Sequence, residues 1–243
     1  MNKAALHRLG NRGAYRAALA FACFVGALVA TTPASGQTPP SAAEAARYDG
    51  LHAAAHEGRA DRVAQLLAGG TAPDARDGHG RTPLHVATFG RHLAVVETLA
   101  RAGADLGALE NDRYDAVTIA AVADDEATLR LLLSLGASAR LVTSRYDGTA
   151  LIAAAHLGHA GVVRQLIAAG APLDHVNNLH WTAVIESIVL GDGGPRHRET
   201  LAALVEAGAN LQLADRNGRT PLALARERGF AEMVGMLEKA GAR

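Results

Sequence analysis

The chain of 243 residues is almost without cysteine, because Cys23 is the only one. One thiol can form no disulfide within the chain, and it cannot supply the thiolate clusters that hold structural zinc. Cys23 also lies in an N-terminal apolar segment that we expect to be removed. The rest of the chain therefore offers no cysteine nucleophile, and packing and hydrogen bonds must hold its fold.

Sequence motifs of the common enzyme classes are also missing. The chain contains no Gly-x-Ser-x-Gly elbow, no Gly-x-x-x-x-Gly-Lys phosphate loop and no His-Glu-x-x-His zinc motif. We therefore expect a protein that is not an enzyme and that binds no cofactor.

An excess of charge of one sign is absent too. Lys plus Arg number 24 and Asp plus Glu number 24. Removal of residues 1–36 takes away four basic and no acidic residues, which leaves 20 against 24 and a net charge of −4. A mildly acidic protein is a poor match for nucleic acid or an anionic membrane, so we expect neither as a partner.

The N-terminus has the pattern of a secretory signal peptide. Residues 1–16 are basic, residues 17–30 are apolar, and Ala34 and Gly36 are small residues suited to a cut before Gln37. An apolar run of about 14 residues is short for a membrane span, although an uncleaved anchor is the alternative. We expect a signal peptide at 1–36 and a linker at 37–46. Arginine far outnumbers lysine, which favours a bacterial source and the periplasm; the extracellular space is the second choice.

An internal repeat dominates the remainder of the chain. An apolar residue followed by a helix signature recurs at intervals of 33, 33, 34, 33 and 38 residues. A fixed period near 33 residues indicates one helical unit stacked on itself, which is a solenoid. We call these apolar positions the register residues: Leu51, Leu84, Val117, Leu151, Val184 and Leu222.

The clearest copy identifies the repeat. Thr82-Pro83-Leu84-His85 is followed by Val95-Val96, Leu99 and Gly103-Ala104-Asp105, a pattern that closely resembles the ankyrin repeat. The resemblance implies an all-α solenoid of six helix–turn–helix repeats with short β-hairpin fingers, covering residues 47–243. The expected repeats are 47–77, 78–110, 111–145, 146–177, 178–215 and 216–243.

Residue types within the repeat explain its helices. Thr82 and Thr220 stand where a helix N-cap is needed, and each is followed by proline, which suits the first helical position. In ankyrin repeats the histidine at the position of His52 and His85 bonds the cap threonine and nearby backbone. We expect these histidines to be structural.

The resemblance also implies a binding groove. The position three residues before the register residue faces the groove in ankyrin proteins, and the position five residues after it lies on the concave side of the first helix. Aromatic residues and arginine are frequent anchors of protein interfaces. The predicted partner-binding residues are Arg81, Tyr114, Trp181, Arg219, Tyr146, His56, Phe89 and His156. The alternative for Trp181 is packing on its neighbouring finger.

The fifth interval contains five extra residues between its two helices. A glycine-rich loop before a helix that begins with basic side chains could hold an anion, although a tolerated surface insertion is the alternative. Glu186 replaces the usual apolar residue of the preceding helix, so we expect a finger donor or an arginine beside it. The possible ligand site of the insert comprises Asp192, Gly193, Gly194, Arg196 and His197.

Histidines are numerous but dispersed. Only His175 and His180 are close enough in one finger to share an ion, and a zinc site needs about four ligands, so we expect no metal site. The prediction is a monomeric protein-binding scaffold of the bacterial cell envelope without stable membrane insertion. Its alternative is an envelope stress-protection or chaperone-like factor. A small-ligand binder or an enzyme at the insert is less favoured.

Overall fold

A computed structural model describes residues 37–243. By its contacts the chain divides into residues 1–38 and residues 39–243, and the second unit is described below. The signal peptide expected at residues 1–36 lies outside the described residues.

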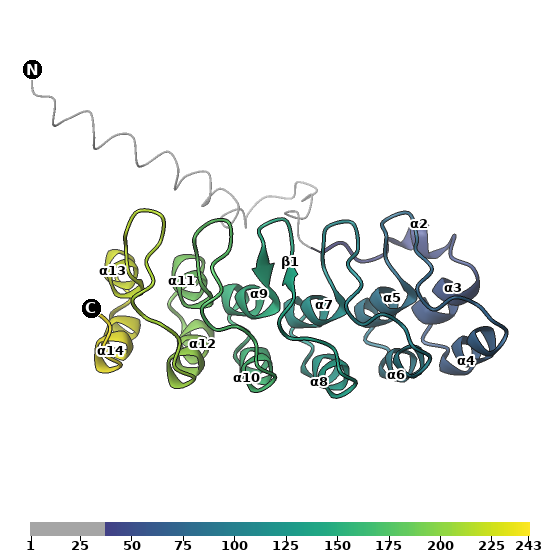
Figure 1. Ribbon diagram of the computed structural model, residues 1–243. Helices are drawn as coiled ribbons and strands as arrows, with labels where there is room; N and C mark the ends of the chain where they lie inside the picture. The colour runs from purple at the N-terminus through teal and green to yellow at the C-terminus, as the bar shows by residue number, and fades with distance from the viewer. Residues whose placement is uncertain (1–36) are drawn as a thin grey trace, which may run out of the picture. The chain divides into compact units, whose positions relative to one another are not determined.

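Residues 39–243 form a row of six antiparallel helix pairs, which confirms the predicted all-α repeat fold. Figure 1 shows the first helices of the pairs side by side in one layer, with the second helices in a parallel layer below. The pairs are α3 (Gly50–His56) with α4 (Ala60–Ala68), α5 (Pro83–Phe89) with α6 (Leu93–Arg101), α7 (Ala116–Val122) with α8 (Glu126–Ser134), α9 (Ala150–Leu157) with α10 (Ala160–Ala168), α11 (Ala183–Val189) with α12 (Pro195–Glu206), and α13 (Pro221–Glu227) with α14 (Ala231–Lys239).

The core is a continuous apolar layer between the two rows of helices. All six register residues are buried, and the Val-Val-x-x-Leu pattern of the second helices is buried against them. As predicted, Thr82 and Thr220 are N-caps with proline at the start of the following helix. Each pair packs on its neighbours in the row, so stability comes from nearest-neighbour contacts.

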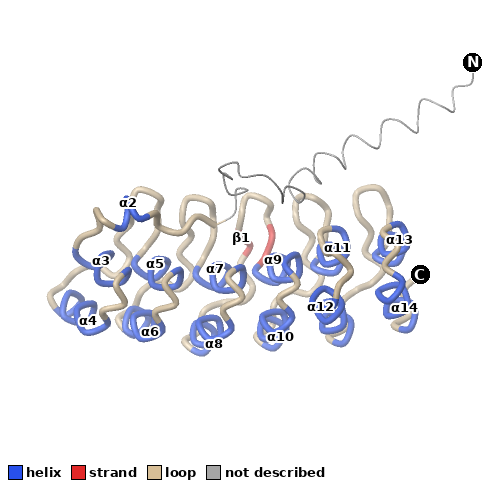
Figure 2. Tube along the Cα trace, turned by 180° about the vertical axis from the view of Figure 1, so that it is seen from behind, coloured by secondary structure: helices blue, strands red, loops and turns tan. Residues whose placement is uncertain are grey.

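The loops that join successive pairs project as fingers beyond the first helices (Figure 2). We number each finger by the pair that follows it, so finger 4 is residues 140–149 and finger 5 is residues 173–182. Finger 4 holds the only sheet in the described residues, in which β1 (Val142–Thr143) pairs antiparallel with β2 (Gly148–Thr149).

The segment expected as a linker, residues 37–46, contains a short helix. Helix α2 (Ala42–Ala45) begins at Ser41, whose hydroxyl and the Glu44 carboxylate make reciprocal capping bonds. The Glu44 carboxylate also lies 3.0 Å from the Arg81 guanidinium. This short helix therefore packs on the first complete finger. None of the helices within residues 37–243 is long and apolar enough to cross a membrane.

Candidate functional site

The two arginines predicted to contact a partner each form an ion pair with an aspartate of their own finger. Arg81 is only 1% exposed, and its Nε lies 2.7 Å from Asp77 Oδ2. Arg219 repeats the arrangement, with Nε 3.0 Å from Asp215 Oδ2. The expectation that Arg81 contacts a partner was wrong, because its guanidinium neutralises a carboxylate of the same turn.

The pair at Arg81 belongs to a compact polar network. Tyr48 donates its hydroxyl to Asp77 at 2.6 Å. Burial alone would raise the pKa of Asp77, but the hydrogen bonds from Tyr48 and Arg81 outweigh it and lower that pKa to about 2. The network is a structural clamp between the first two repeats.

Tyr114 is also unsuited to a partner, because only 8% of it is exposed. Burial raises the pKa of its phenol, and Glu110 accepts a hydrogen bond from its backbone N–H at 3.0 Å. The prediction failed because register counting gives the position of a side chain along the repeat and does not give its depth.

The concave side of the first helices keeps some predicted residues accessible. His56 and His156 are exposed and Phe89 is half-buried. The His56 ring meets the Tyr48 ring edge-on at 6.1 Å, so part of its surface is used within the protein.

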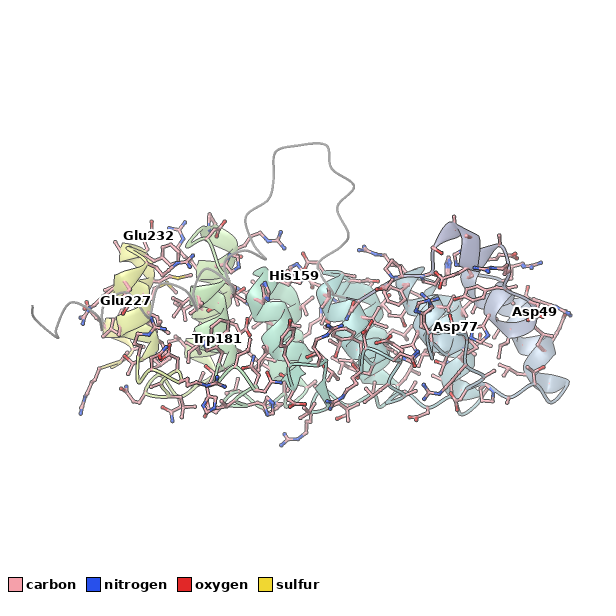
Figure 3. All side chains as sticks on the ribbon, turned by 90° about the horizontal axis from the view of Figure 1, so that it is seen from above. Asp49, Asp77, His159, Trp181, Glu227 and Glu232 are labelled. Atoms are coloured by element: carbon pink, nitrogen blue, oxygen red, sulfur yellow. The ribbon has the colours of Figure 1, made fainter. Side chains whose placement is uncertain are left out.

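Fingers 4 and 5 carry most of the exposed large hydrophobic residues of the described chain. Of the six large hydrophobic residues exposed in residues 37–243, four lie on these two fingers, and only Tyr146 was predicted. Short irregular loops show no apolar periodicity, so no sequence pattern predicts that the other three are exposed. We define the finger patch as Val142 (39% exposed), Tyr146 (41%), Val176 (43%) and Leu179 (38%). Trp181, labelled in Figure 3, lies on finger 5 and is half-buried against the core.

Backbone and charged contacts hold the fingers together. Asn178 N–H donates to the Tyr146 carbonyl at 2.9 Å, and His175 Nε2 lies 2.6 Å from the Asp147 carbonyl oxygen. Arg113 pairs with Asp147 at 3.0 Å across fingers 3 and 4. The finger patch is therefore displayed on a preformed surface.

The side chains of the insert are bound to neighbouring repeats. Arg196 lies 3.0 Å from Asp124, which is two repeats away. His197 places Nδ1 2.9 Å from Asp192 and Nε2 2.9 Å from the His156 carbonyl oxygen. An anion would have to displace these contacts, so the geometry favours a packing role.

The glycines of the insert serve the same packing. Gly193 has a φ of +71°, and a Cβ added there would lie 2.6 Å from the Phe230 ring. The Asp192 side chain accepts a hydrogen bond from Gly194 N–H at 2.8 Å. Arg228 donates to the Gly191 carbonyl at 2.9 Å. The loop is thus fitted to the last repeat.

Glu186 is a buried carboxylate in the first helix of the fifth pair, α11. Its side chain is 5% exposed, and Asn177 Nδ2 donates to its Oε1 at 2.9 Å, which confirms the predicted finger donor. The other oxygen, Oε2, has no hydrogen-bond partner and lies 3.6 Å from His156 Nδ1. Burial raises the pKa of Glu186 to about 7, against the opposing effect of the Asn177 bond.

The remaining conspicuous histidines have structural partners. His85 is 1% exposed and bonds Thr82 and the carbonyls of Ala108 and Tyr114, as predicted. His159, labelled in Figure 3, is buried and bonds the Ala121 carbonyl at 2.9 Å. Within residues 37–243 no group of three or more metal-ligating side chains converges.

Known proteins similar to this chain share the repeat. The family profile described as "Ankyrin repeats (3 copies)" matches residues 35–110, 51–141 and 117–215. The ankyrin repeat protein YahD of Escherichia coli strain K12 is 36% identical over 78% of this chain and 94% of its own length. A solved ankyrin repeat domain from Acinetobacter baumannii AYE is 43% identical, with a TM-score of 0.75, over 79% of this chain and 98% of that one.

A third similarity is to a solved structure from the IkappaB protein family. The solved ankyrin repeat domain of Bcl-3 is 28% identical, with a TM-score of 0.73, over 81% of this chain and 88% of that one. Ankyrin repeats generally mediate protein–protein interaction, and their fold is typically a non-enzymatic binding scaffold. The repeat profile and the bacterial relatives together show that this chain belongs to the ankyrin-repeat family.

Proposed function

We propose that this protein is a binding scaffold of the bacterial cell envelope that holds a partner protein on fingers 4 and 5 and the adjoining concave side of the first helices. The observation that carries the proposal is the finger patch, where four of the six exposed large hydrophobic residues of the described chain lie on two neighbouring fingers. Clustered exposed apolar residues are typical of protein-binding surfaces.

The rigidity of the fingers supports the same surface. Fingers 3, 4 and 5 are joined by backbone hydrogen bonds at Ser144 and Asn178, and by the ion pairs Arg113–Asp147 and Arg145–Asp112. Binding to a preformed surface costs little loop entropy. Tyr146, with its exposed ring, is the anchor that we expect to contribute most.

The envelope location rests on the N-terminal pattern of basic, apolar and small residues and on the bacterial relatives. N-terminal sequencing of the protein purified from its native cells tests it. We expect the mature chain to begin near Gln37 and to remain in solution after carbonate washing of membranes. An intact Met1 on membrane-bound protein would contradict the proposal.

Site-specific photo-cross-linking tests the binding surface. A benzoylphenylalanine at Tyr146 should form one stoichiometric adduct in intact cells. The matched control is the same residue at Leu93, which is also 41% exposed but begins α6 in the second layer. Equal adducts from both positions, or none from Tyr146, would refute the proposed surface.

A further inference from the structure

Fingers 2, 5 and 6 form the same turn, and finger 5 differs from the other two in its side chains. Seven residues before the register residue, fingers 2 and 6 carry Asp77 and Asp215. In each, one carboxylate oxygen accepts hydrogen bonds from the backbone of the finger turn, and the other pairs with the arginine four residues on. The carboxylate is neutralised within its own finger.

Finger 5 forms the same turn, but asparagine replaces the aspartate. Asn177 Oδ1 accepts hydrogen bonds from Leu179 N–H and Trp181 N–H at 3.0 Å, as the aspartates do. Its other side-chain atom is an amide nitrogen, which donates, and Trp181 replaces the arginine. The carboxylate now stands two residues after the register residue, as Glu186, where the other repeats have Ala53, Val86, Ile119, Ala153 and Leu224.

Within residues 37–243, Glu186 has no arginine beside it, unlike Asp77 and Asp215. Its Oε2 is buried without a hydrogen bond, and the neighbouring His156 Nδ1 is 3.6 Å away. A buried polar oxygen left unpaired costs roughly 1–3 kcal/mol, and more if it is charged. A guanidinium from another protein would give Glu186 the positive charge and the hydrogen bonds that Arg81 and Arg219 give to Asp77 and Asp215.

Access to Oε2 depends on His156. The His156 side chain is 48% exposed, and its ring makes no hydrogen bond to any residue of the described chain. A half-exposed ring without hydrogen bonds can change rotamer at low cost. His156 therefore stands at the mouth of the site, with Glu186 and Asn177 behind it.

We propose that Glu186, Asn177 and His156 form a subsite of the concave surface that receives an arginine side chain of the partner protein. The inference rests on the proposed function and adds the chemistry of one contact. The guanidinium bonds Glu186 Oε2 after the His156 ring swings outward, and Asn177 keeps its bond to Oε1. Arginine suits a carboxylate geometrically and forms strong charge-assisted hydrogen bonds.

Proton linkage gives the subsite a distinctive signature. The group must be ionised to hold a cation, and burial places the pKa of Glu186 at about 7 in the free protein. A bound cation lowers the pKa of Glu186. The affinity for the cation therefore rises with pH through neutrality, and Glu186 releases a proton when the cation binds. Among neighbouring charges, His156 on α9 faces Glu186. His197 on α12 pairs with Asp192. On α13, Arg226 pairs with Glu238 and Glu227 pairs with Arg219.

A small cation tests the subsite without the partner. The purified protein carries ¹³C-carboxyl glutamate, and the probes are N-ethylguanidinium and its neutral analogue N-ethylurea. We expect a saturable shift of the Glu186 resonance with the guanidinium only, and a lower titration midpoint in its presence. No saturable shift, or equal shifts with both probes, would overturn the inference.

Three variants sharpen this measurement. Glu186→Gln identifies the resonance and should abolish guanidinium binding, while Glu206→Gln, at an exposed position of α12, should not. His156→Ala should tighten binding of the probe, because no ring needs to move. Loss of probe binding in His156→Ala would show that the imidazole is the contact, and would overturn the arginine assignment.

The cross-linked partner separates this inference from the proposed function. Glu186→Gln should weaken partner binding about tenfold, equivalent to about 1.4 kcal/mol, and Glu206→Gln should leave it unchanged. A partner that cross-links at Tyr146 but binds Glu186→Gln normally would refute the subsite and leave the scaffold standing. Absence of any adduct at Tyr146 would refute the scaffold, while the guanidinium titration would still decide the subsite.

Discussion

Single side chains in this protein show how one position can be structural in one repeat and available in another. Three residues before the register residue, Arg81 is buried in a clamp with Asp77, Tyr114 is buried, and Trp181 is half-buried. The position along the repeat was predictable for all three. Burial was not, because it depends on what the adjacent finger and helix place against the side chain.

His85 gives the first prediction at this scale. Its Nδ1 accepts from Thr82 N–H at 3.0 Å, so Nε2 carries the proton that bonds the Ala108 carbonyl at 3.0 Å. His85→Ala leaves these buried groups unpaired and should lower the free energy of unfolding by about 1–3 kcal/mol. His52→Ala removes one bond of a half-buried ring and should cost less. Urea unfolding measures both, and equal small losses would contradict the structural role.

Glu186 gives a prediction with a definite pH window. Its pKa is raised from 4.5 to about 7, so the unfolded chain loses this proton first as pH rises. The native state therefore loses about 1.4 kcal/mol of stability per pH unit between these two values, in total about 3–4 kcal/mol. Glu186→Gln should match the parent protein near pH 4.5 and exceed its stability at pH 8.

Urea unfolding of both proteins across this range measures the difference, with Glu206→Gln as the exposed control. A stability gain that is the same at pH 4.5 and pH 8 would show that Glu186 does not titrate in this window.

At the scale of elements, the insert changes how repeats 5 and 6 fit together. Its five extra residues place Pro195 at the start of α12, the longest described helix, with 12 residues. Arg196 then reaches Asp124, and Gly193 receives the Phe230 ring. The sequence showed the length of the insert, whereas its neighbours became visible only in the folded chain.

The fit of Gly193 can be tested against a glycine of equal conformation. Gly193 and Gly229 both have a φ of +71°. A Cβ added at Gly193 would meet the Phe230 ring, whereas a Cβ added at Gly229 would have no neighbour within 4 Å among the described residues. Gly229→Ala should cost roughly 1–2 kcal/mol, the cost of a left-handed L-residue. Gly193→Ala should cost about 1–3 kcal/mol more, because the methyl group overpacks against the ring. Thermal unfolding of the two variants compares them, and equal costs would argue that the loop moves freely from Phe230.

Residues 39–243 form a one-dimensional stack of repeats, so the effect of a core change depends on its place in the row. Leu166 in α10 and Leu237 in α14 occupy the same position of their repeats, and both are fully buried. The central residue has repeats on both sides, while the last repeat has one neighbour. Nearest-neighbour stability therefore predicts different consequences for the same substitution.

Leu166→Ala should destabilise the protein by about 2–5 kcal/mol and speed amide exchange on both sides of α10. Leu237→Ala should speed exchange mainly in α13 and α14 and leave the central repeats protected. Hydrogen exchange with mass spectrometry distinguishes them. Uniform exchange in both variants would indicate a globally cooperative unit.

The sequence alone determined the repeat architecture, because register residues, N-cap threonines and second-helix valines follow local rules that recur every 33 or so residues. It also identified His85 as structural and predicted a donor for Glu186, which is Asn177. Only the tertiary structure decided which finger residues are exposed, and it left one oxygen of Glu186 unpaired beside His156. Periodicity fixes where a residue stands within its repeat, whereas exposure and pairing depend on contacts with the neighbouring repeats, which the local pattern does not encode.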